Sequence, residues 1–496
     1  MKQYPHLYID GQWTDPIEPR DIELIDPTRE EPFARVTVGT AADADKAVAA
    51  AKKAFETFSA TTVEERVALI DRIIDVYESY AEEFSELIAR EVGIPVSNRA
   101  QVTGPAEHMR VARDIIRSYP FEASIGDAIV RREPIGVCAL ISPWNWPIQT
   151  GVIKVIYGLA AGCTIVAKPS LNSAASGTLL AQVLHEAGVP AGVFNLVNGT
   201  GRDVGDALSR HPDVDMISFT GSTAAGQQVG AAAAGTVKRV CLELGGKSAN
   251  IVLPDADLEK AARWNIQRCF FNAGQSCHAP ARMLVHESQI DQVVPFLVDE
   301  AERFRLGDPL DSSTTMGPVV SAAQYKSIRD LIRSGIDEGA QLVTGGLKRP
   351  DGTERGYFIQ PTVFTRVTSA MTIAREEIFG PVLAVIPYRD EDDALRIAND
   401  SPYGLGGYVF GDDHARARRI ANGLRAGRIG YNGAPTDSYT PMGGYKQSGV
   451  GRSMGRFGLD EYLEVKSVYG FADEAQELPQ LFGPIEEIPS VTGISE

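Results

Sequence analysis

The sequence predicts an α/β fold with two doubly wound parallel-sheet domains and a small β arm. After residue 131, short apolar runs without polar alternation are separated by glycine-rich turns and helical segments. Such runs are typical of strands covered on both faces, and their alternation with helices indicates a doubly wound sheet. A second alternation follows Gly245–Gly246, a natural hinge, and 496 residues allow about three folding units. The predicted strands are 136–142, 164–168, 193–197, 216–220 and 239–244 in the first domain and 281–287, 380–388 and 406–411 in the second.

Helical periodicity predicts helices in the segments around these strands. The chain begins with a short strand and turn at 7–13, and Asp43 is placed as the N-cap of a helix over 43–58. The tail 473–496 is acidic and shows no periodicity, so we expect an extended arm or a loose end. Further helical spacing is found over 63–90, 288–303, 323–338, 391–399 and 415–424.

Composition excludes several classes of function. There are 48 basic and 65 acidic residues, and a net charge of −17 disfavours binding to nucleic acid or to anionic membranes. The five cysteines show no Cys-x-x-Cys spacing and the histidines are scattered singly, so we expect neither a disulfide framework nor a metal site. The N-terminus has no apolar signal region, and the apolar stretch 151–167 is short and interrupted by Lys154. We therefore expect a cytoplasmic protein.

Unusual residues follow the predicted strands of the first domain. Asn145 lies just after the first strand, Lys168 ends the second, a glycine turn 221–226 follows the fourth, and Glu243 ends the fifth. Ligands bind at this edge of a parallel sheet, and a turn leading into a helix offers its N–H groups to a phosphate. Each feature also has a plainer interpretation. The glycines can form no more than a tight turn, Lys168 can lie at a sheet edge with its amine in water, and Glu243 can be a buried carboxylate paired with an arginine. The stretch 199–205 has the wrong spacing for a dinucleotide fingerprint.

Cys277 differs from the other four cysteines, which lie in apolar segments. It occupies a small polar turn, Asn272–Pro280, where a substrate can approach it and where it can be activated as a thiolate. A turn cysteine alone is more often inert than catalytic, so its interpretation depends on its neighbours.

Six motifs in order resemble the NAD(P)-dependent aldehyde dehydrogenase superfamily of the hydrolytic type, over nearly the whole chain. They are PWNWP (143–147), FTGST (219–223), LELGGKSA (242–249), FFNAGQSC (270–277), EEIFGPV (376–382) and GGYKQSG (443–449).

The resemblance implies the catalytic roles. Cys277 is the expected nucleophile, and the Asn145 amide with the Cys277 N–H forms the expected oxyanion hole. After hydride transfer, Glu243 is expected to activate the water that hydrolyses the thioester, since flanking apolar residues would raise its pKa toward neutrality. Lys154 and Glu464 match positions that the family uses to assist proton transfer.

The same resemblance implies a site for NAD. Lys168 is expected at the adenosine ribose, Ser222 at the pyrophosphate, and Glu377 with Phe379 at the nicotinamide ribose and ring. Many NAD-preferring members have a glutamate where this chain has Leu171, and another where it has Ala224, so NADP is not excluded. The remaining residues expected around the cofactor are Trp144, Ser170, Gly221 and Leu244.

The family also implies a domain plan and an oligomer. A dinucleotide-binding domain is expected over 1–117 and 137–244, and a catalytic domain over 245–459. An oligomerisation arm over 118–136 and 460–475 would join subunits into a homodimer or homotetramer, with 476–496 as a C-terminal tail.

Two other functions stay open at this point. One is a dehydrogenase that transfers the acyl group to coenzyme A, and the presence of Glu243 argues against it. The other is a non-catalytic scaffold, and the presence of Cys277, Glu243 and Asn145 argues against that. The aldehyde is not specified. Trp146, Phe271 and His278 are expected to border its tunnel, which suits aromatic or medium aliphatic aldehydes, or else the aromatic residues are core.

Overall fold

The first large sheet has a parallel centre and antiparallel edges. The computed structural model describes residues 1–481 and orders this sheet β20-β12-β11-β8-β9-β10-β2-β3. All five central strands were predicted from the sequence to within two residues, and β8 and β9 are buried along their whole length. The strands are β2 (Leu7–Ile9), β3 (Gln12–Thr14), β8 (Val137–Ile141), β9 (Thr164–Lys168), β10 (Phe194–Leu196), β11 (Met216–Thr220), β12 (Arg239–Glu243) and β20 (Gly449–Val450).

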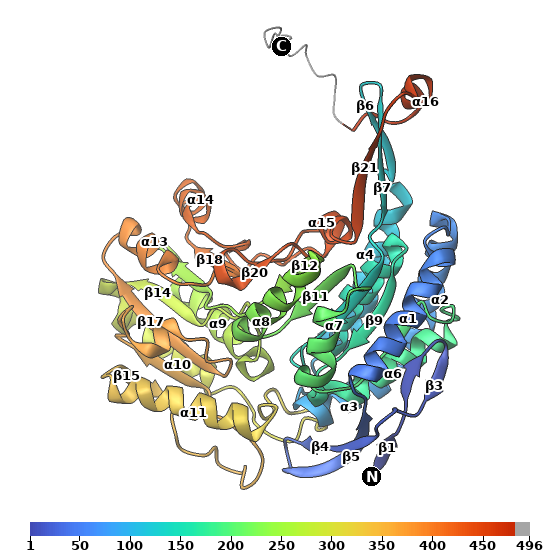
Figure 1. The fold of residues 1–496 in the computed structure, drawn as a ribbon. Coiled ribbons are helices and arrows are strands. Elements are labelled where there is room, and N and C mark those ends of the chain that lie inside the picture. The colour runs from blue at the N-terminus through green and yellow to red at the C-terminus, as the bar shows by residue number, and fades with distance from the viewer. Residues whose placement is uncertain (482–496) are drawn as a thin grey trace.

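Helices cover both faces of this sheet, and each face has its own apolar core (Figure 1). Alternate residues of β8 enter different cores: Cys138 and Leu140 one, Val137 and Ala139 the other. This is the two-sided burial that the apolar runs predicted. One core holds α2 (Val63–Ser79), α3 (Ala81–Val92), α4 (Ala100–Ser118), α5 (Pro147–Ala161) and α6 (Ala174–Glu186), and the other holds α1 (Ala41–Phe58), α7 (Asp206–Arg210) and α8 (Thr223–Ala233).

Two details of the predicted helices were wrong. The N-cap of α1 is Thr40, and Asp43 is the third helical residue, whose carboxylate accepts a hydrogen bond from the Thr40 N–H at 2.9 Å. The stretch 63–90 forms two helices, because the chain turns at Tyr80 between α2 and α3. That turn brings the Phe84 ring onto the Tyr77 ring at 5.2 Å, a contact between helices that periodicity does not report.

The second large sheet has the order β15-β16-β17-β14-β13-β18-β19 and is parallel except for β15. The chain reaches it through Gly245–Gly246, since β12 ends at Glu243 and β13 begins at Ala249. The strands are β13 (Ala249–Val252), β14 (Arg282–His286), β15 (Gln341–Thr344), β16 (Thr362–Thr365), β17 (Val382–Tyr388), β18 (Gly406–Phe410) and β19 (Arg428–Tyr431). The helices are α9 (Leu258–Phe270), α10 (Ile290–Ala301), α11 (Ala322–Asp337), α12 (Thr372–Arg375), α13 (Glu391–Asn399) and α14 (His414–Gly423).

Not every strand of the expected catalytic domain belongs to the second sheet. β20 belongs to the stretch 245–459, yet it pairs with β12 at the edge of the first sheet. The domain boundaries themselves stay a prediction. A small sheet near the N-terminus is formed by β1 (Lys2–Tyr4), β4 (Arg20–Asp26) and β5 (Glu31–Val38).

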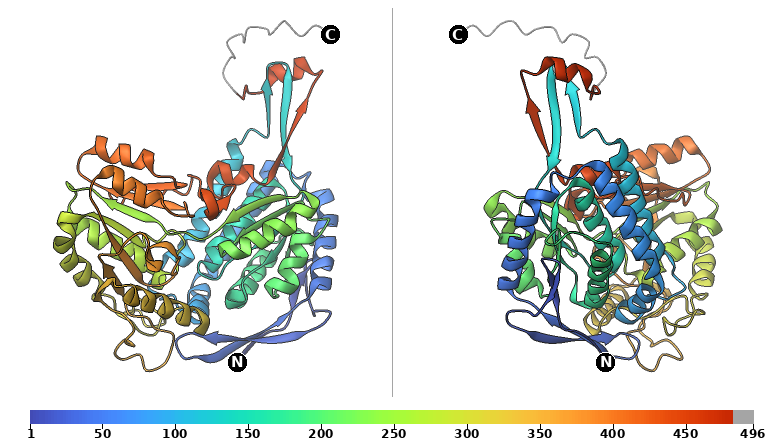
Figure 2. Two further views of the ribbon diagram at one scale, coloured as in Figure 1. Left: turned by 60° about the vertical axis from the view of Figure 1, so that its left-hand side comes forward. Right: turned by 90° about the vertical axis from the view of Figure 1, so that its right-hand side faces the viewer.

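A three-stranded arm projects away from both large sheets (Figure 2). It consists of β6 (Glu122–Ile125), β7 (Ala128–Pro134) and β21 (Leu463–Val468), and β21 follows the short α15 (Gly455–Asp460). The expectation of an extended arm or a loose end from residue 473 was wrong for its first part, because α16 spans Ala472–Glu477. Beyond it, Ser124 N–H donates to the Pro479 carbonyl at 3.0 Å, so the chain returns along β6. The rest of the expected tail, 482–496, lies outside the described residues.

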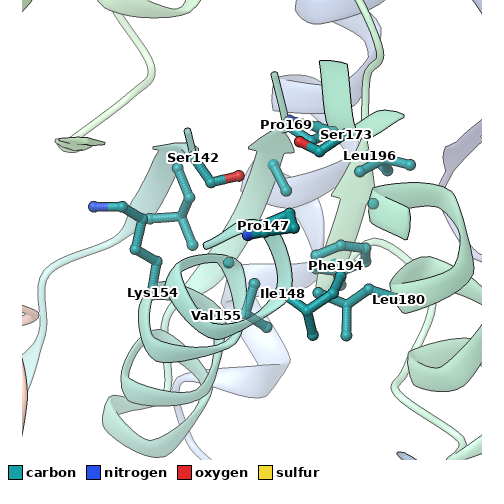
Figure 3. Close-up of a pocket in the computed structure, with 14 residues that line it drawn as sticks. Ser142, Pro147, Ile148, Lys154, Val155, Pro169, Ser173, Leu180, Phe194 and Leu196 are labelled. Carbon is teal, nitrogen blue, oxygen red and sulfur yellow. The ribbon is translucent and has the colours of Figure 1, made fainter. Parts of the chain in front are cut away.

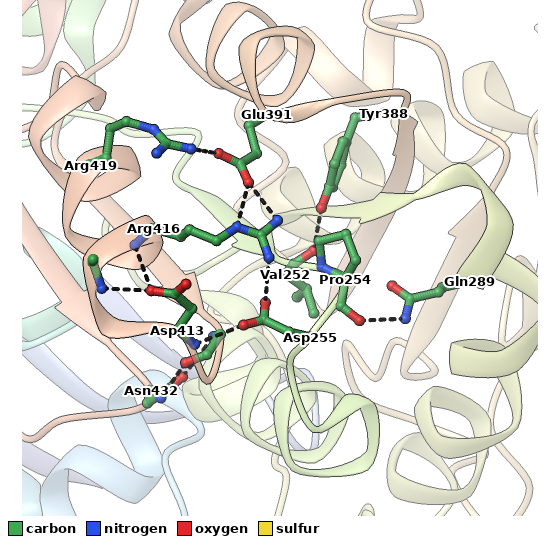
Figure 4. A network of polar contacts seen from close by, with 12 residues as sticks. Val252, Pro254, Asp255, Gln289, Tyr388, Glu391, Asp413, Arg416, Arg419 and Asn432 are labelled. Atoms are coloured by element: carbon green, nitrogen blue, oxygen red, sulfur yellow. Dashed lines mark hydrogen bonds and ion pairs between the residues drawn. The ribbon is translucent and has the colours of Figure 1, made fainter.

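The carboxyl edge of the second sheet is filled by its own polar network (Figure 4). Glu391, just after β17, pairs with Arg416 at 2.6 Å and with Arg419, both on α14. Asp255, just after β13, accepts the Asp413 N–H at 2.7 Å. Within residues 1–481, no helix has the length and apolar character needed to cross a membrane.

Candidate active site

The carboxyl edge of the first sheet faces the loop that carries Cys277. Asn145 follows β8, and its Nδ2 donates to the Gln275 carbonyl at 2.9 Å. In return, Asn272 Nδ2 donates to the Asn145 carbonyl at 2.8 Å. Residues that the sequence separates by 127 and 130 positions are thus held together by two buried hydrogen bonds. The Asn145 amide has a second N–H that this contact leaves free for another acceptor.

The backbone before Cys277 is strained. Asn272, Ala273 and Gly274 all have positive φ, at 55°, 51° and 73°. A side chain at Gly274 would collide with the Gly380 carbonyl, because an added Cβ would lie 2.0 Å from that oxygen. Left-handed backbone at non-glycine residues costs free energy and persists where the surrounding structure enforces it. Here the Asn272 side chain donates to the Asn145 carbonyl, and Gly274 packs against the segment that carries Glu377 and Phe379.

Two glycines allow the same segments to meet at Gly245–Gly246. Glu377 Oε1 accepts the Gly246 N–H at 2.8 Å. An added Cβ would lie 2.3 Å from Glu377 Oε2 at Gly245, and 2.3 Å from the Cys277 carbonyl oxygen at Gly246. The glycine pair is therefore required for close approach of Glu377 and of the Cys277 loop, a role beyond that of the hinge that the sequence predicted.

Glu243 is a buried carboxylate without a hydrogen-bond partner among residues 1–481. Burial raises its pKa to about 7, while the Lys154 ammonium and the Ser453 side chain oppose this shift. A carboxyl group with a pKa near 7 suits a general base at neutral pH.

Cys277 differs from the expectation of a ready thiolate. Its side chain is neither fully buried nor exposed, unlike the other four cysteines, which are buried. Burial raises the pKa of Cys277 to about 12, with further contributions from Glu377 and Glu243, while the N–H groups of Cys277 and His278 oppose the shift. Burial is thus the main reason that the thiol form of Cys277 is favoured, and the two carboxylates add to it.

Lys154 and Glu464 do not come together. Lys154 is buried on α5, and its Nζ donates to Ser218 Oγ at 2.7 Å. It lies at the rim of a cavity of about 20 Å³, with its amine directed away from the apolar lining (Figure 3). Glu464 is exposed on β21 and pairs with Arg239 at 2.8 Å. Arg239 begins β12 and Glu243 ends it, so Glu464 lies at the opposite end of that strand from the candidate base.

The residues expected around a dinucleotide line the same edge. Ser222 is the N-cap of α8, whose first N–H groups have no partner within the helix. Gly226 has room for no side chain, since an added Cβ would lie 2.4 Å from Leu244. The rings of Trp144 and Phe379 meet edge to face at 5.4 Å.

Lys168 and Leu171 lie beside these residues. Burial lowers the pKa of Lys168 to about 8, and its Nζ donates to the Pro169 carbonyl at 3.2 Å. Ser170 caps the short turn that begins at Leu171, and Leu171 borders a cavity of about 270 Å³.

Residues 13–468 match the model described as the aldehyde dehydrogenase family. The chain belongs to the aldehyde dehydrogenase family. A relative from Pseudomonas sp, named 3-succinoylsemialdehyde-pyridine dehydrogenase, is 49% identical over 95% of this chain and 99% of its own length.

Solved structures agree with this assignment. Aldehyde dehydrogenase C of Pseudomonas syringae, a mutant complexed with NAD+ and octanal, is 48% identical with a TM-score of 0.93, covering 94% of this chain and 96% of its own. A Mycobacterium tuberculosis aldehyde dehydrogenase complexed with NAD+ is 40% identical with a TM-score of 0.92, covering 95% and 98%. The sequence prediction of an NAD-dependent aldehyde dehydrogenase with two α/β sheets is confirmed.

The site residues of this aldehyde dehydrogenase fit a dinucleotide. The Ser222 side chain accepts the Ala225 N–H, and the Thr223 and Ala224 N–H groups, which have no acceptor within residues 1–481, suit a pyrophosphate. The buried Lys168 ammonium suits ribose hydroxyls. Within residues 1–481, no three potential metal-ligating side chains gather as a group.

Sequence reasoning missed two residues near the aldehyde dehydrogenase site, Arg428 and Ser453. Both lie near Glu243, and their charge or polarity lowers its pKa against the effect of burial. No local pattern marks either one, because Arg428 begins a strand of the second sheet and Ser453 follows β20, and their relation to Glu243 arises only in the folded chain.

Proposed function

We propose that this chain oxidises an aldehyde to its carboxylic acid by the hydrolytic route, with Cys277 as nucleophile and Glu243 as base. The observation that carries the proposal is the buried Glu243 carboxylate, which has no hydrogen-bond partner within residues 1–481 and raises the pKa of Cys277. An unpaired buried carboxylate is costly, and its retention next to a thiol is explained by a role in proton transfer.

In this proposal the chain's own residues move the protons. Glu243 accepts the Cys277 thiol proton, and the sulfur forms a bond to the aldehyde carbon. The carbonyl oxygen becomes an anion that accepts hydrogen bonds from the Asn145 amide and the Cys277 N–H, each donor being worth about 2.7–4 kcal/mol. Bound NAD+ supplies the acceptor for the hydride that leaves this carbon, so that a thioester remains on Cys277.

Hydrolysis then requires a base for water. Glu243, having released its first proton to solvent, takes a proton from water, the hydroxide attacks the thioester carbon, and the carbon–sulfur bond breaks to release the acid. Lys154 is assigned to favour the charged form of Glu243, in line with its opposing effect on the pKa of that carboxyl. Glu464 is given no role in these steps, because Arg239 pairs with it at the far end of β12.

For the cofactor, we assign Lys168 and Ser170 to the adenosine ribose, and Gly221 and Ser222 to the pyrophosphate. Glu377 is assigned to the nicotinamide ribose. Trp144, Leu244 and Phe379 are assigned to apolar contacts with the cofactor. Use of NADP is not excluded, because Leu171 carries no negative charge that would repel its 2′-phosphate.

Assembly and location are also proposed. The projecting arm leaves Val465, Tyr469 and Phe471 exposed at 64%, 75% and 49%, which favours a homodimer or homotetramer joined through it. Five cysteines without a disulfide favour the reducing cytoplasm.

The test is formation of NADH from an aldehyde without coenzyme A, with identification of the product. The acid as product, at a rate unchanged by added coenzyme A, is the expected result. Acyl-coenzyme A as the main product would assign the chain to the acylating type instead. Absence of turnover together with a Cys277 that iodoacetamide does not alkylate would support a scaffold.

A further inference from the structure

Arg428 makes no ion pair with a described residue, and Glu243 is a carboxylate on which its charge acts. Arg428 begins β19, and no side-chain hydrogen bond of its guanidinium is found within residues 1–481. Its Nη2 is buried and has no partner. Arg268, near the end of α9, likewise makes no ion pair with any described residue. Leaving a guanidinium partly desolvated and unpaired is unfavourable unless a ligand supplies the missing acceptor.

The sheet register directs Arg428 toward the Cys277 loop. In the parallel pair of β18 and β19, Gly406 lies opposite Arg428 and Tyr408 opposite Gly430. Arg428 and Tyr408 therefore lie on the same face of the sheet. Tyr408 Oη donates to the His278 carbonyl at 2.8 Å, which ties this face to the residue after Cys277.

Arg268 approaches the same place from the helix above that face. The ring of Trp264 on α9 lies 4.9 Å from the ring of Tyr408. Arg268 follows Trp264 by four residues, one helical turn, so it lies on the same side of α9. Burial lowers the pKa of His278 to about 3, and the charges of Arg268 and Arg428 lower it further. Both arginines are thus within electrostatic reach of the residue after Cys277.

The surroundings on this side of Cys277 are aromatic or neutral. Trp146 and Phe271 stack at 5.6 Å, and Trp146 Nε1 donates to Ser276 Oγ at 3.1 Å. His108 on α4 is buried, and burial lowers its pKa to about 4 with a further contribution from Arg428. Glu377 is assigned to the cofactor, and Glu243 acts on Arg428 electrostatically without forming an ion pair with it. A substrate chain that extends from Cys277 past these aromatic rings would approach Arg428 and Arg268.

We propose that Arg428, with Arg268 beside it, binds a carboxylate at the far end of the substrate, so that the preferred substrates are aldehydes that also carry an acid group. A guanidinium and a carboxylate match in shape and charge and form two parallel hydrogen bonds. This inference rests on the proposed function, since it names the substrate class of that same site.

The experiment compares oxo acids of four to six carbons with methyl-ended aldehydes of the same length, using NAD+ and the full chain. We expect kcat/KM to favour the oxo acids. Arg428→Gln should lower the ratio of kcat/KM for oxo acids to kcat/KM for methyl-ended aldehydes by about 30-fold or more, because any effect on both classes through the pKa of Glu243 cancels in that ratio. Arg428→Lys should keep part of the preference. Arg333→Gln, which removes an exposed and unpaired arginine of α11, is the matched control and should change neither class.

Two results would overturn the proposal. One is a parent protein that prefers the methyl-ended aldehydes, as an octanal-type substrate would require. The other is an Arg428→Gln variant that loses the same factor on both classes with a shifted pH profile, which would make Arg428 a positioning residue for Glu243.

A second measurement needs no turnover. Glutarate, an unreactive dicarboxylate, should slow iodoacetamide alkylation of Cys277 in the parent and in Arg333→Gln, but not in Arg428→Gln. Protection without oxidation of any aldehyde would contradict the proposed function and keep the carboxylate site. Oxidation of aldehydes without protection by glutarate would contradict the carboxylate site and leave the proposed function in place.

Discussion

The carboxyl edges of the two large sheets share a topology and differ in chemistry. At the first edge, Lys168 and Glu243 end buried strands, and Glu243 has no hydrogen-bond partner within residues 1–481. At the second edge, Glu391 is paired with Arg416 and Arg419, and the Asp255 carboxylate accepts the Asp413 N–H (Figure 4). Parallel strands bring polar groups to both edges, but only groups left without partners can recognise a ligand.

The two edges also differ in whether their carboxylates have partners. Removing a paired carboxylate at the second edge should affect folding alone, whereas removing an unpaired one at the first should affect chemistry alone. The following predictions test that division, beginning with the largest effect.

Replacing the nucleophile should have the largest effect. Cys277→Ser should lower kcat by about 10⁴-fold or more, because a hydroxyl near a carboxylate is a far weaker nucleophile than a thiolate. Steady-state NADH formation measures it. Cys138→Ala, which removes a buried thiol of β8, should retain activity at the cost of some stability. Turnover by Cys277→Ser at the parent rate would refute the assignment.

Replacing the base should separate the two halves of the reaction. Glu243→Gln should slow steady-state turnover by about 10²–10⁴-fold, because the thioester is no longer hydrolysed with base assistance. Stopped-flow measurement should still show one equivalent of NADH per site formed in the first turnover. Glu300→Gln, at a buried carboxylate of the second sheet's helices, serves as the control.

The pH profile should report the same carboxyl. The base must be deprotonated, and burial raises the pKa of Glu243 to about 7. The rate of thioester hydrolysis should therefore be constant above that pH and fall about tenfold per unit below it. A profile that stays flat down to pH 5 would show that another group accepts the proton.

At the second edge the expected effect is on stability. Glu391→Gln should lower the free energy of unfolding by about 1–3 kcal/mol, because the charges of Arg416 and Arg419 lose their acceptor. Thermal unfolding measures this loss, and kcat/KM should stay unchanged. A loss of activity at constant stability would show that this edge takes part in function.

The smallest expected change is in cofactor preference. Leu171→Glu should raise the preference for NAD over NADP by about tenfold, because a carboxylate there would repel a 2′-phosphate and accept hydrogen bonds from ribose hydroxyls. The ratio of kcat/KM values for the two dinucleotides measures it, with Leu171→Gln as the uncharged control. An equal effect of both variants would rule out the electrostatic explanation.

The sequence by itself determined the parallel strands and the family, because uninterrupted apolar runs and ordered motifs are local features of the chain. It also singled out Asn145, Glu243 and Cys277 by their positions after strands and in a polar turn. The position of Asp43 follows from its local capping interaction with Thr40. The split between α2 and α3 and the separation of Glu464 from Lys154 were decided by tertiary packing. The unpaired Arg428 belongs with these, because whether a charge has a partner depends on strands and helices that are distant in the chain and meet only in the folded protein.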